Sequence, residues 1–372
     1  MILIVNLGST SLKYQLYDTD NSECRLKIQR SIDQSPNWVE IWQFILVTCN
    51  QNEIKVESIK TVLHRVVFAP IDVLQSQDTN LFEVRDQLLD RLDDTSDFAP
   101  LHNPASLGFI KFIQGLNSDM TQFLVFDNYL YRNIPESNYR LAIPKSWEKD
   151  YQVRRYGYHG LAHKSMLNQL KYLPQATKIL TIQLGGGCSI TGFEDGVPLV
   201  NSMGFGTCGG LIMPTRSGDI DSGAIIHLLN RPEITTASLQ YDLHHKSGLF
   251  ALAGQEYQGD MRLILANLDN PDCKQALEMF VDSIVGYIGN YWLRFGGFGA
   301  VAFGGGIGGG SDIIRDLVIK KLNILGIALE SELNIQANET LVPQLVSSQK
   351  SNCEVWVIPV NEAEIMMEGL DS

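Results

Sequence analysis

The feature that most constrains the fold is a short pattern that occurs twice, about half the chain apart. Residues 4–11 (IVNLGSTS) and residues 181–188 (TIQLGGGC) each combine an apolar run, an amide side chain, Leu-Gly and small residues. In both copies a second strand returns toward an acidic turn, at Asp18 and at Asp195. Two ordinary β-hairpins could give this coincidence, but a repeat at this separation favours two related domains that face each other.

Strand-like and helix-like segments alternate along the chain, which predicts an α/β architecture. A segment rich in proline and aromatic residues at 134–147 predicts a crossover and a main domain boundary near residues 130–150. Apolar runs predict strands at residues 2–6, 13–17, 60–67, 121–126, 178–184, 300–303 and 353–358. Amphipathic or long apolar patterns predict helices at residues 37–48, 81–92, 219–230, 271–295 and 311–325.

Composition excludes several classes of protein. The 372 residues are 44% hydrophobic and 19% charged, which is typical of a core-forming chain and not of a disordered one. The net charge of −13 argues against binding to nucleic acid or to an anionic membrane through bulk charge. No segment resembles a membrane span or a secretory leader, and the six scattered cysteines indicate reduced thiols. We therefore expect a cytoplasmic protein.

Two glycine clusters follow apolar strands, at residues 185–187 and 304–310. Such turns expose backbone N–H groups and allow a phosphate or a purine to approach the chain closely. Ser311 and Asp312 follow the second cluster and are good residues for the start of a helix. Neither cluster carries a Walker lysine, and glycine-rich turns are often only tight turns, so each cluster alone is a moderate indication of nucleotide binding.

The chain resembles the acetate/propionate kinases over essentially its whole length. Residues 6–14 (NLGSTSLKY) resemble the first signature of that family, and residues 215–221 (TRSGDID) resemble the second. Further matches are residues 64–67, 99–104, 154–160, 246–249 and 358–362. The resemblance implies a duplicated two-domain, actin-like (ribonuclease H-like) ATPase fold with a nucleotide in the cleft, and a homodimer. It assigns residues 1–140 to the N-terminal domain, with 363–372 packing back on it, and residues 141–362 to the C-terminal, nucleotide-binding domain.

The resemblance also implies the catalytic groups. A carboxylic acid is already ionised at pH 7, so its phosphorylation needs no general base, but the site must neutralise two anions and the transferred phosphoryl group. Arg65 and Arg216 match the two active-site arginines of the family, whose planar forks suit a carboxylate or a phosphoryl group. His159 matches a donor to the phosphoryl group, and Asp127, at the end of a strand, matches the residue that positions Mg²⁺ or the carboxylate. His163, one helical turn after His159, is either a supporting residue or merely packed.

The remaining positions follow from the same resemblance. Asn6 and Glu362 match the residues that hold Mg²⁺ and its waters, although Asn6 could serve only the turn and Glu362 only a helix start. The acyl pocket would contain Val67, Leu101, Tyr158 and Thr207, beside Arg65. ATP would be held by Lys13, Ser9, Ser11, Gln183, Gly185, Gly186, Gly187, Asp260, Met261, Arg262, Gly306, Ile307, Gly308, Gly309 and Gly310.

The chain departs from the family pattern at four places. Residues 183–187 (QLGGG) replace His-Leu-Gly-Asn-Gly, which removes a possible cation and an asparagine and should weaken the hold on phosphate. Residues 306–311 (GIGGGS) replace Gly-Ile-Gly-Glu-Asn-Ser, which changes the adenosine loop. Tyr158 and Thr207 replace Phe and Pro, so their hydroxyls either favour a polar acid or bond to the backbone. Residues 206–210 lack the usual Pro and Glu.

Two kinds of function follow. The first is an enzyme that transfers the γ-phosphoryl group of ATP, with Mg²⁺, in line to a short-chain carboxylate, with acetate as the default acid. A carboxylate kinase with another acid or another phosphoryl donor is the variant of this hypothesis. The second is a nucleotide- or acyl-phosphate-binding protein with little turnover, which the change at Gln183 would favour.

Overall fold

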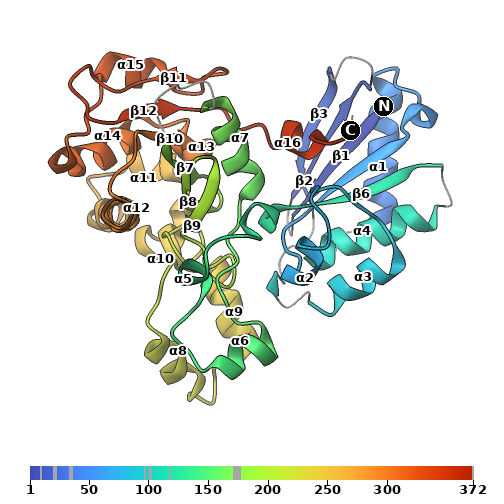
Figure 1. The fold of residues 1–372 in the computed structure, drawn as a ribbon, viewed down its shortest axis with the longest axis horizontal. Helices are drawn as coiled ribbons and strands as arrows, with labels where there is room; N and C mark the ends of the chain where they lie inside the picture. The colour runs from blue at the N-terminus through green and yellow to red at the C-terminus, as the bar shows by residue number, and fades with distance from the viewer. Residues whose placement is uncertain are drawn as a thin grey trace. The chain divides into compact units, whose positions relative to one another are not determined.

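The computed structural model describes residues 1–8, 11–19, 23–32, 37–95, 98–99, 103–116, 119–170 and 177–370. The chain forms two compact units, each with its own sheet and helices (Figure 1). Unit 1 contains residues 1–132 together with the C-terminal segment 361–372, and unit 2 contains residues 133–360. The return of the C-terminal segment to unit 1 adds an acidic residue to the strand ends of that unit.

Unit 1 is built on a six-stranded mixed sheet. Its order is β3-β2-β1-β4-β6-β5, in which β1, β4 and β6 are parallel and each remaining neighbour is antiparallel. The parallel strands are mostly buried and apolar, as is typical of strands covered on both faces. The strands are β1 Ile2–Leu7, β2 Ser11–Tyr17, β3 Cys24–Ser31, β4 Thr61–Val66, β5 Phe82–Glu83 and β6 Thr121–Phe126.

The sheet of unit 2 repeats this topology. From the opposite edge its order is β9-β8-β7-β10-β12-β11, with β7, β10 and β12 parallel and each remaining neighbour antiparallel. The two sheets therefore match strand for strand, and the predicted duplicated α/β fold is confirmed. The strands are β7 Lys178–Leu184, β8 Cys188–Glu194, β9 Val197–Asn201, β10 Ala300–Gly304, β11 Gln344–Leu345 and β12 Glu354–Val357.

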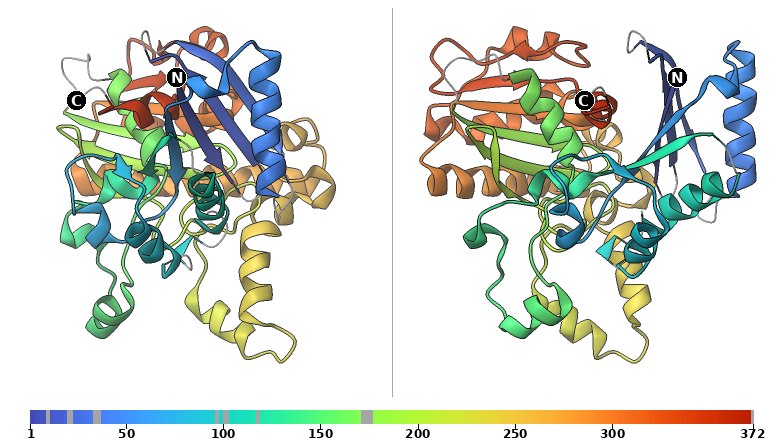
Figure 2. Two further views of the ribbon diagram at one scale, coloured as in Figure 1. Left: turned by 90° about the vertical axis from the view of Figure 1, so that its right-hand side faces the viewer. Right: turned by 45° about the vertical axis from the view of Figure 1, so that its right-hand side comes forward.

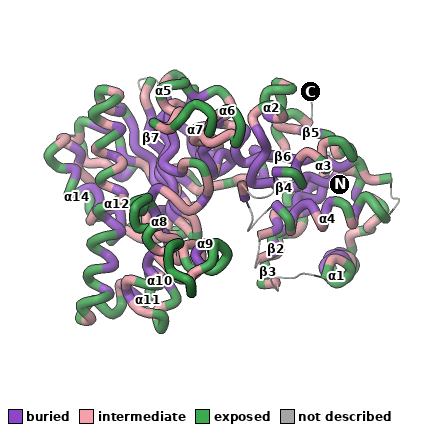
Figure 3. Tube along the Cα trace, turned by 90° about the horizontal axis from the view of Figure 1, so that it is seen from below, coloured by how far each residue is buried: buried purple, intermediate pink, exposed green. Residues whose placement is uncertain are grey.

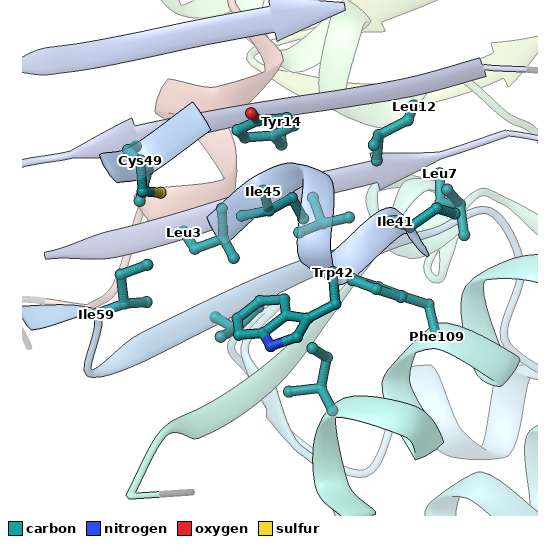
Figure 4. Packing of buried hydrophobic residues seen from close by; sticks show 14 residues of the cluster. Leu3, Leu7, Leu12, Tyr14, Ile41, Trp42, Ile45, Cys49, Ile59 and Phe109 are labelled. Atoms are coloured by element: carbon teal, nitrogen blue, oxygen red, sulfur yellow. The ribbon is translucent and has the colours of Figure 1, made fainter. Parts of the chain in front are cut away.

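The core of unit 1 lies between its sheet and helices α1 (Trp38–Gln51) and α4 (Asn103–Gly115) (Figure 4). Leu3 of β1, Ile45 of α1 and Phe109 of α4 meet there and are almost fully buried. Helix α1 begins where the Asn37 side chain accepts hydrogen bonds from the backbone N–H groups of the first turn. In Figures 1 and 2 the sheet lies between α1 and the C-terminal helix α16 (Glu362–Met367).

One predicted helix in unit 1 is wrong in part. The segment 81–92 begins with the edge strand β5, and helix α3 covers only Asp86–Asp93. A two-residue strand leaves too short an alternating pattern to be distinguished from the start of an amphipathic helix. The other helical elements of unit 1 are α2 Ile71–Leu74 and the 3₁₀ segments η1 Val56–Ser58 and η3 Asp127–Tyr131.

In unit 2, helices α7 (Gly160–Leu170) and α12 (Pro271–Phe295) pack against the sheet (Figure 2). Helix α12 has the bounds that its sequence predicts, because Asn270 caps its start, Pro271 occupies the first turn and Gly296 ends it at φ 73°. The other helical elements are α5 Glu136–Tyr139, α6 Lys145–Tyr151, α8 Ser222–Leu229, α9 Thr236–His245, α10 Gly248–Ala253, η4 Gln255–Tyr257, α11 Met261–Leu265, α13 Gly305–Gly308, α14 Asp312–Lys321, η5 Asn323–Leu325 and α15 Ser331–Gln336.

Among the described residues, no helix combines the length and the apolar character that crossing a bilayer requires.

Candidate active site

Three adjacent parallel strands of unit 1 end in polar side chains that meet. Asn6 lies in β1, Arg65 in β4, and Asp127 directly follows β6. Arg65 Nη2 donates to Asp127 Oδ2 at 2.8 Å, and Arg65 Nη1 donates to Asn6 Oδ1 at 3.3 Å. Because the carboxyl ends of parallel strands share one edge of a sheet, this is the place where an α/β fold gathers ligand-binding groups.

The C-terminal segment adds a second carboxylate to this cluster. Glu362, at the start of α16, lies 3.7 Å from Arg65 Nη1 and accepts from Asn6 Nδ2 at 3.4 Å. Burial alone would lower the pKa of Arg65, but the Asp127 and Glu362 carboxylates outweigh it and raise that pKa above its ordinary value. The cluster therefore keeps a permanent positive charge beside two carboxylates.

The donor set of this cluster fits a magnesium ion. It offers the carboxylates of Asp127 and Glu362 and the amide oxygen of Asn6, and Mg²⁺ prefers such oxygens while keeping several of its waters. Within the described part of the chain, no group of three or more His, Cys, Asp or Glu side chains forms a dedicated metal cage. A sparse oxygen set of this kind suits an ion that is also bound by phosphate oxygens.

The first glycine hairpin lies next to the cluster. Lys13 of β2 is the register partner of Asn6, so the two side chains are on the same face of the sheet, and the Lys13 side chain is exposed. The backbone of Gly8 and Ser11 closes the turn with a 2.8 Å hydrogen bond. Val67 is buried just after β4. The predicted residues Ser9 and Leu101 lie outside the described part of the chain.

In unit 2 the second glycine hairpin lies against His159. A Cβ atom on Gly187 would lie 2.7 Å from His159 Nε2 and 3.6 Å from Arg216 Nη1, so the two side chains face one point of the hairpin. His159 precedes α7 and adopts φ 59°, a left-handed conformation that non-glycine residues rarely hold. Such a conformation is often retained at functional sites.

Arg216 carries a positive charge that no carboxylate of a described residue compensates. Its Nη1 donates to the backbone oxygen of Thr207 at 3.0 Å, and it forms no ion pair with any described residue. Burial lowers the pKa of Arg216, which means that its surroundings solvate the charge poorly. A half-buried guanidinium of this kind is a strong candidate for binding an anion.

A chain of buried side chains, in which the sequence indicated His163 but neither hydroxyl, lies behind His159 and contacts it. His159 Nδ1 lies 2.9 Å from Ser189 Oγ, and His163 Nε2 lies 2.7 Å from the same oxygen. His163 Nδ1 is 2.6 Å from Thr181 Oγ1. His163 is thus a supporting residue of His159. Neither hydroxyl belongs to a recognisable motif, so only the fold could reveal them.

The late glycine cluster forms the short helix α13 where a turn was expected. Gly305 adopts φ 79°, and a Cβ there would lie 2.4 Å from the backbone oxygen of Leu184 and 2.6 Å from Gln183 Nε2. The two glycine segments are therefore packed backbone to backbone at the ends of β7 and β10. Gln183 Oε1 is buried and has no hydrogen-bond partner among the described residues.

A buried arginine anchors this glycine segment. Arg315 of α14 is fully buried and donates to the backbone oxygens of Gly308 and Gly309, at 2.8 and 3.1 Å. It also bonds to the side chain and backbone of Asn334 and to the side chain of Asn338. Burial lowers the pKa of Arg315 to about 10, and the nearby Asp312 carboxylate opposes that effect. No sequence motif indicated this anchor.

The residues predicted near adenosine differ in accessibility. Asp260 caps α11 and binds Arg262 at 2.5 Å, and the hydrogen bond from Arg262 lowers the pKa of Asp260. Met261 between them is buried. We therefore expect Asp260 and Arg262, rather than the Met261 side chain, to be available to a ligand.

The structure shows the partner of one hydroxyl in the predicted acyl pocket, that of Tyr158. Tyr158 is buried and its hydroxyl donates to the backbone oxygen of Phe205 at 2.7 Å. This hydrogen bond favours the second of the two interpretations of Tyr158, in which its hydroxyl bonds to the backbone. Thr207 is also buried, and its backbone oxygen accepts from Arg216.

A cavity of about 680 Å³ lies elsewhere in unit 2, along α12. The described residues that line it include Arg155, Asp219, Tyr287 and Arg294 but none of the predicted site residues. Asp219 accepts from the Tyr287 hydroxyl and from the backbone N–H of Gly210, and so ties α12 to the loop that carries Thr207 and Arg216.

Solved structures with the same fold place the chain in a class. The crystal structure of a propionate kinase from Francisella tularensis aligns with a TM-score of 0.87, 27% identity, and coverage of 98% of this chain and 97% of that one. The structure of the Porphyromonas gingivalis acetate kinase aligns with a TM-score of 0.84, 26% identity, and coverage of 98% and 97%. The fold is the actin-like ATPase fold of these kinases.

Sequence comparison identifies the family within this class. The profile of the acetokinase family matches residues 27–368. Acetate kinase 1 of Lactococcus lactis is 32% identical, with 100% of this chain and 98% of the relative covered, and the acetate kinase of Bacillus cytotoxicus is 31% identical over 98% and 96%. The chain belongs to the acetokinase family, and the predicted resemblance is confirmed.

Proposed function

We propose that the protein transfers the γ-phosphoryl group of ATP directly and reversibly to the carboxylate of a short-chain acid, giving an acyl phosphate and ADP. Acetate is the default acid. The observation that carries the proposal is the uncompensated, half-buried guanidinium of Arg216 beside His159 at a glycine hairpin. This arrangement suits a site where an anion must be bound and its charge neutralised.

The four predicted catalytic residues have distinct roles in this proposal. Arg65 and Arg216 neutralise the carboxylate and the transferred phosphoryl group, and His159 donates a hydrogen bond to that group. The Asp127 carboxylate keeps Arg65 oriented through the 2.8 Å hydrogen bond. Because the acid is already ionised, no residue needs to remove a proton before attack.

Magnesium and nucleotide complete the proposed site. Asn6, Asp127 and Glu362 would hold Mg²⁺, which supplies charge neutralisation for the phosphates when bound. Lys13, Ser11 and the backbones at residues 185–187 and 306–310 would contact phosphates. Ser9 and Leu101 keep their proposed roles in phosphate and acid binding. Val67, Tyr158 and Thr207 would shape the acyl pocket.

The unusual second hairpin keeps one alternative open. Gln183 Nε2 packs against Gly305, and Gln183 Oε1 lacks a partner within the described residues, so nothing there replaces the cation that the family usually has. A weak nucleotide-binding protein would tolerate this loss better than an enzyme. The uncompensated Arg216 favours the enzyme, because a pure binder has no need of groups that stabilise a transferring phosphoryl group.

Trapping the product with hydroxylamine tests the proposed function. The purified protein is incubated with Mg-ATP, hydroxylamine and a panel of short carboxylic acids, and hydroxamate is measured. Hydroxamate with acetate or propionate is expected. Signal only with a hydroxylated acid would revise the substrate, and no signal with ATP, GTP or pyrophosphate would favour the binding protein.

We also propose that the protein is a homodimer that uses helices α8 and α9. These helices extend away from the sheet of unit 2 in Figures 1 and 2, and α8 is apolar yet has no buried residue (Figure 3). Ile226, Leu229 and Tyr241 are 61%, 41% and 46% exposed. An apolar helix exposed in this way indicates an interaction surface, and a second copy of the chain is the expected partner.

The proposed location is the cytoplasm. All six cysteines are free thiols, which is typical of a reducing compartment.

A further inference from the structure

Three buried side chains and His159, which is only partly buried, form a continuous hydrogen-bonded chain that ends at His159. In order they are Thr181 on β7, His163 on α7, Ser189 on β8 and His159, with successive distances of 2.6, 2.7 and 2.9 Å. Thr181, His163 and Ser189 are at most 1% exposed. Water is therefore excluded from the middle of the chain, where the buried hydroxyls and the His163 ring bond to one another.

The Ser189 hydroxyl couples the two imidazoles. It has one hydrogen and lies within bonding distance of a nitrogen on each ring. It donates to one nitrogen and must accept from the other, so one imidazole presents N–H to Ser189 and the other presents a lone pair. The tautomer of His163 consequently determines the tautomer of His159 when both rings are neutral.

With both rings neutral, the hydrogen atoms can be arranged along the chain in two ways that keep all of its hydrogen bonds. In the first, Thr181 donates to His163 Nδ1, the hydrogen of His163 is on Nε2, and Ser189 donates to His159 Nδ1, which leaves the hydrogen of His159 on Nε2. In the second, every bond is reversed, and Thr181 must donate to the backbone oxygen of Thr191 at 3.4 Å. In the first arrangement the Thr181 hydroxyl donates over the 2.6 Å distance to His163. In the second it donates over a long and weak hydrogen bond to Thr191, so the first arrangement is favoured.

The Arg216 guanidinium favours a neutral His159 ring. The Arg216 guanidinium faces the same point of Gly187 as His159 Nε2, and a nearby cation disfavours imidazolium. The neighbouring thiol of Cys188 offers no counter-charge, because burial raises its pKa to about 12. A neutral imidazole can donate to an anion from Nε2 only if its hydrogen is on that atom.

We propose that Thr181, His163 and Ser189 are positioning residues that hold His159 neutral with its hydrogen on Nε2, so that it donates to the anionic group without being protonated. The role of this donor rests on the proposed kinase function, but the tautomer is a property of the protein itself. His159 does not need to take up a proton when the anion binds, because its Nε2 already carries the hydrogen that it donates.

Nitrogen-15 NMR of the histidine-labelled full-length protein reads the tautomers directly. His159→Gln and His163→Gln variants assign the two rings, and spectra are recorded without ligand at pH 7.5. The expected result is hydrogen on Nε2 and a lone pair on Nδ1 of both rings. Hydrogen on Nδ1 of both rings, or a doubly protonated His159, would overturn the proposal even if the protein is an active kinase.

The Thr181 hydroxyl supplies a matched pair of variants. Thr181→Ser keeps the donor, so we expect the His163 Nδ1 resonance and turnover close to those of the native protein. Thr181→Val removes the donor while keeping the shape, so we expect the Nδ1 resonance of His163 to move and kcat to fall about tenfold with little change in KM. Equal spectra and equal rates for both variants would contradict a role for the chain. The resonances can be measured even if the protein has no kinase activity. Failure of the proposed function is therefore distinguishable from failure of the positioning proposal.

Discussion

The backbone of Gly187 lies directly against the imidazole of His159. A Cβ atom at this position would approach His159 Nε2 to 2.7 Å and Cε1 to 2.8 Å, closer than real side chains allow, with Arg216 Nη1 at 3.6 Å. Only glycine at this position therefore allows the second hairpin to lie against both His159 and Arg216. The finding explains why this position of the hairpin needs glycine although its φ angle does not.

Gly187→Ala should reduce kcat about 100-fold, because it displaces the His159 ring from its position. The native fold should persist, since the displaced ring is at the edge of the core. Steady-state kinetics and a thermal unfolding curve measure both effects. Gly289→Ala is the matched control, because a Cβ there meets nothing within 4 Å. Native-like kcat in Gly187→Ala would remove His159 from the mechanism.

Arg315→Met should raise the KM for ATP several-fold and leave the KM for the acid nearly unchanged. The substitution frees the backbone oxygens of Gly308 and Gly309, which Arg315 holds, and loosens the segment proposed to contact the nucleotide. It also leaves buried acceptors unsatisfied, at a cost of about 1–3 kcal/mol each.

Because that cost could unfold the protein, Asn338→Ala provides a milder variant. It removes one hydrogen bond to Arg315 and the bond from Asn338 to Asp312. A smaller rise in the KM for ATP is expected. If both variants raise the KM for ATP and the KM for the acid equally, Arg315 does not act specifically on nucleotide binding.

His64 should make the protein less stable in mild acid. It is buried beside Arg65 on β4, its Nε2 lies 2.8 Å from Gln122 Oε1, and burial lowers its pKa from 6.5 to about 4. Between these values the unfolded chain binds a proton that the folded protein excludes. The free energy of unfolding should therefore fall as the pH drops from about 6.5 to about 4, by up to about 3 kcal/mol from this group.

Urea unfolding at several pH values measures this dependence. His64→Gln removes the titrating group and should flatten the curve between pH 4 and 6.5, whereas His227→Gln changes an exposed histidine and should leave the curve as it is. An unchanged slope in His64→Gln would show that other groups produce the acid sensitivity.

Ile226→Asp should weaken the proposed dimer. The side chain is 61% exposed on α8, and a carboxylate there would be costly to bury in an apolar interface. Sedimentation velocity should show a shift from dimer to monomer at micromolar concentration. Val47→Asp on α1 of unit 1, which is 54% exposed, should not change the oligomeric state. A native chain that sediments as a monomer would contradict the proposal.

The parts of the fold that local patterns determine were predictable from the sequence. The repeated Leu-Gly hairpin predicted the duplication because an apolar strand and a small-residue turn leave a recognisable local pattern in both copies. Helix α12 was predicted to the residue because Asn270, Pro271 and Gly296 are strong local signals. Strand β5 was missed because its partner on β6 stabilises only two residues.

Only those residues of the candidate site that lie in sequence motifs were predictable. Asn6, Arg65 and Asp127 each follow or end an apolar strand, so their convergence in unit 1 could be expected from the topology. The groups that support the site could not, because their partners are distant in sequence. Ser189 contacts His159 from 30 residues away, and Arg315 reaches Asn334 and Asn338. Contacts of this kind depend on tertiary structure.

The most direct test of the account is the path of oxygen during the reaction. The protein is incubated with Mg-ATP and acetate that carries ¹⁸O in both carboxylate oxygens, and the products are followed by ³¹P NMR. Direct transfer to the carboxylate predicts acetyl phosphate with one ¹⁸O bridging carbon and phosphorus, together with an equal amount of ADP. Release of inorganic phosphate without acetyl phosphate, or acetyl phosphate whose phosphorus carries no ¹⁸O, would contradict it.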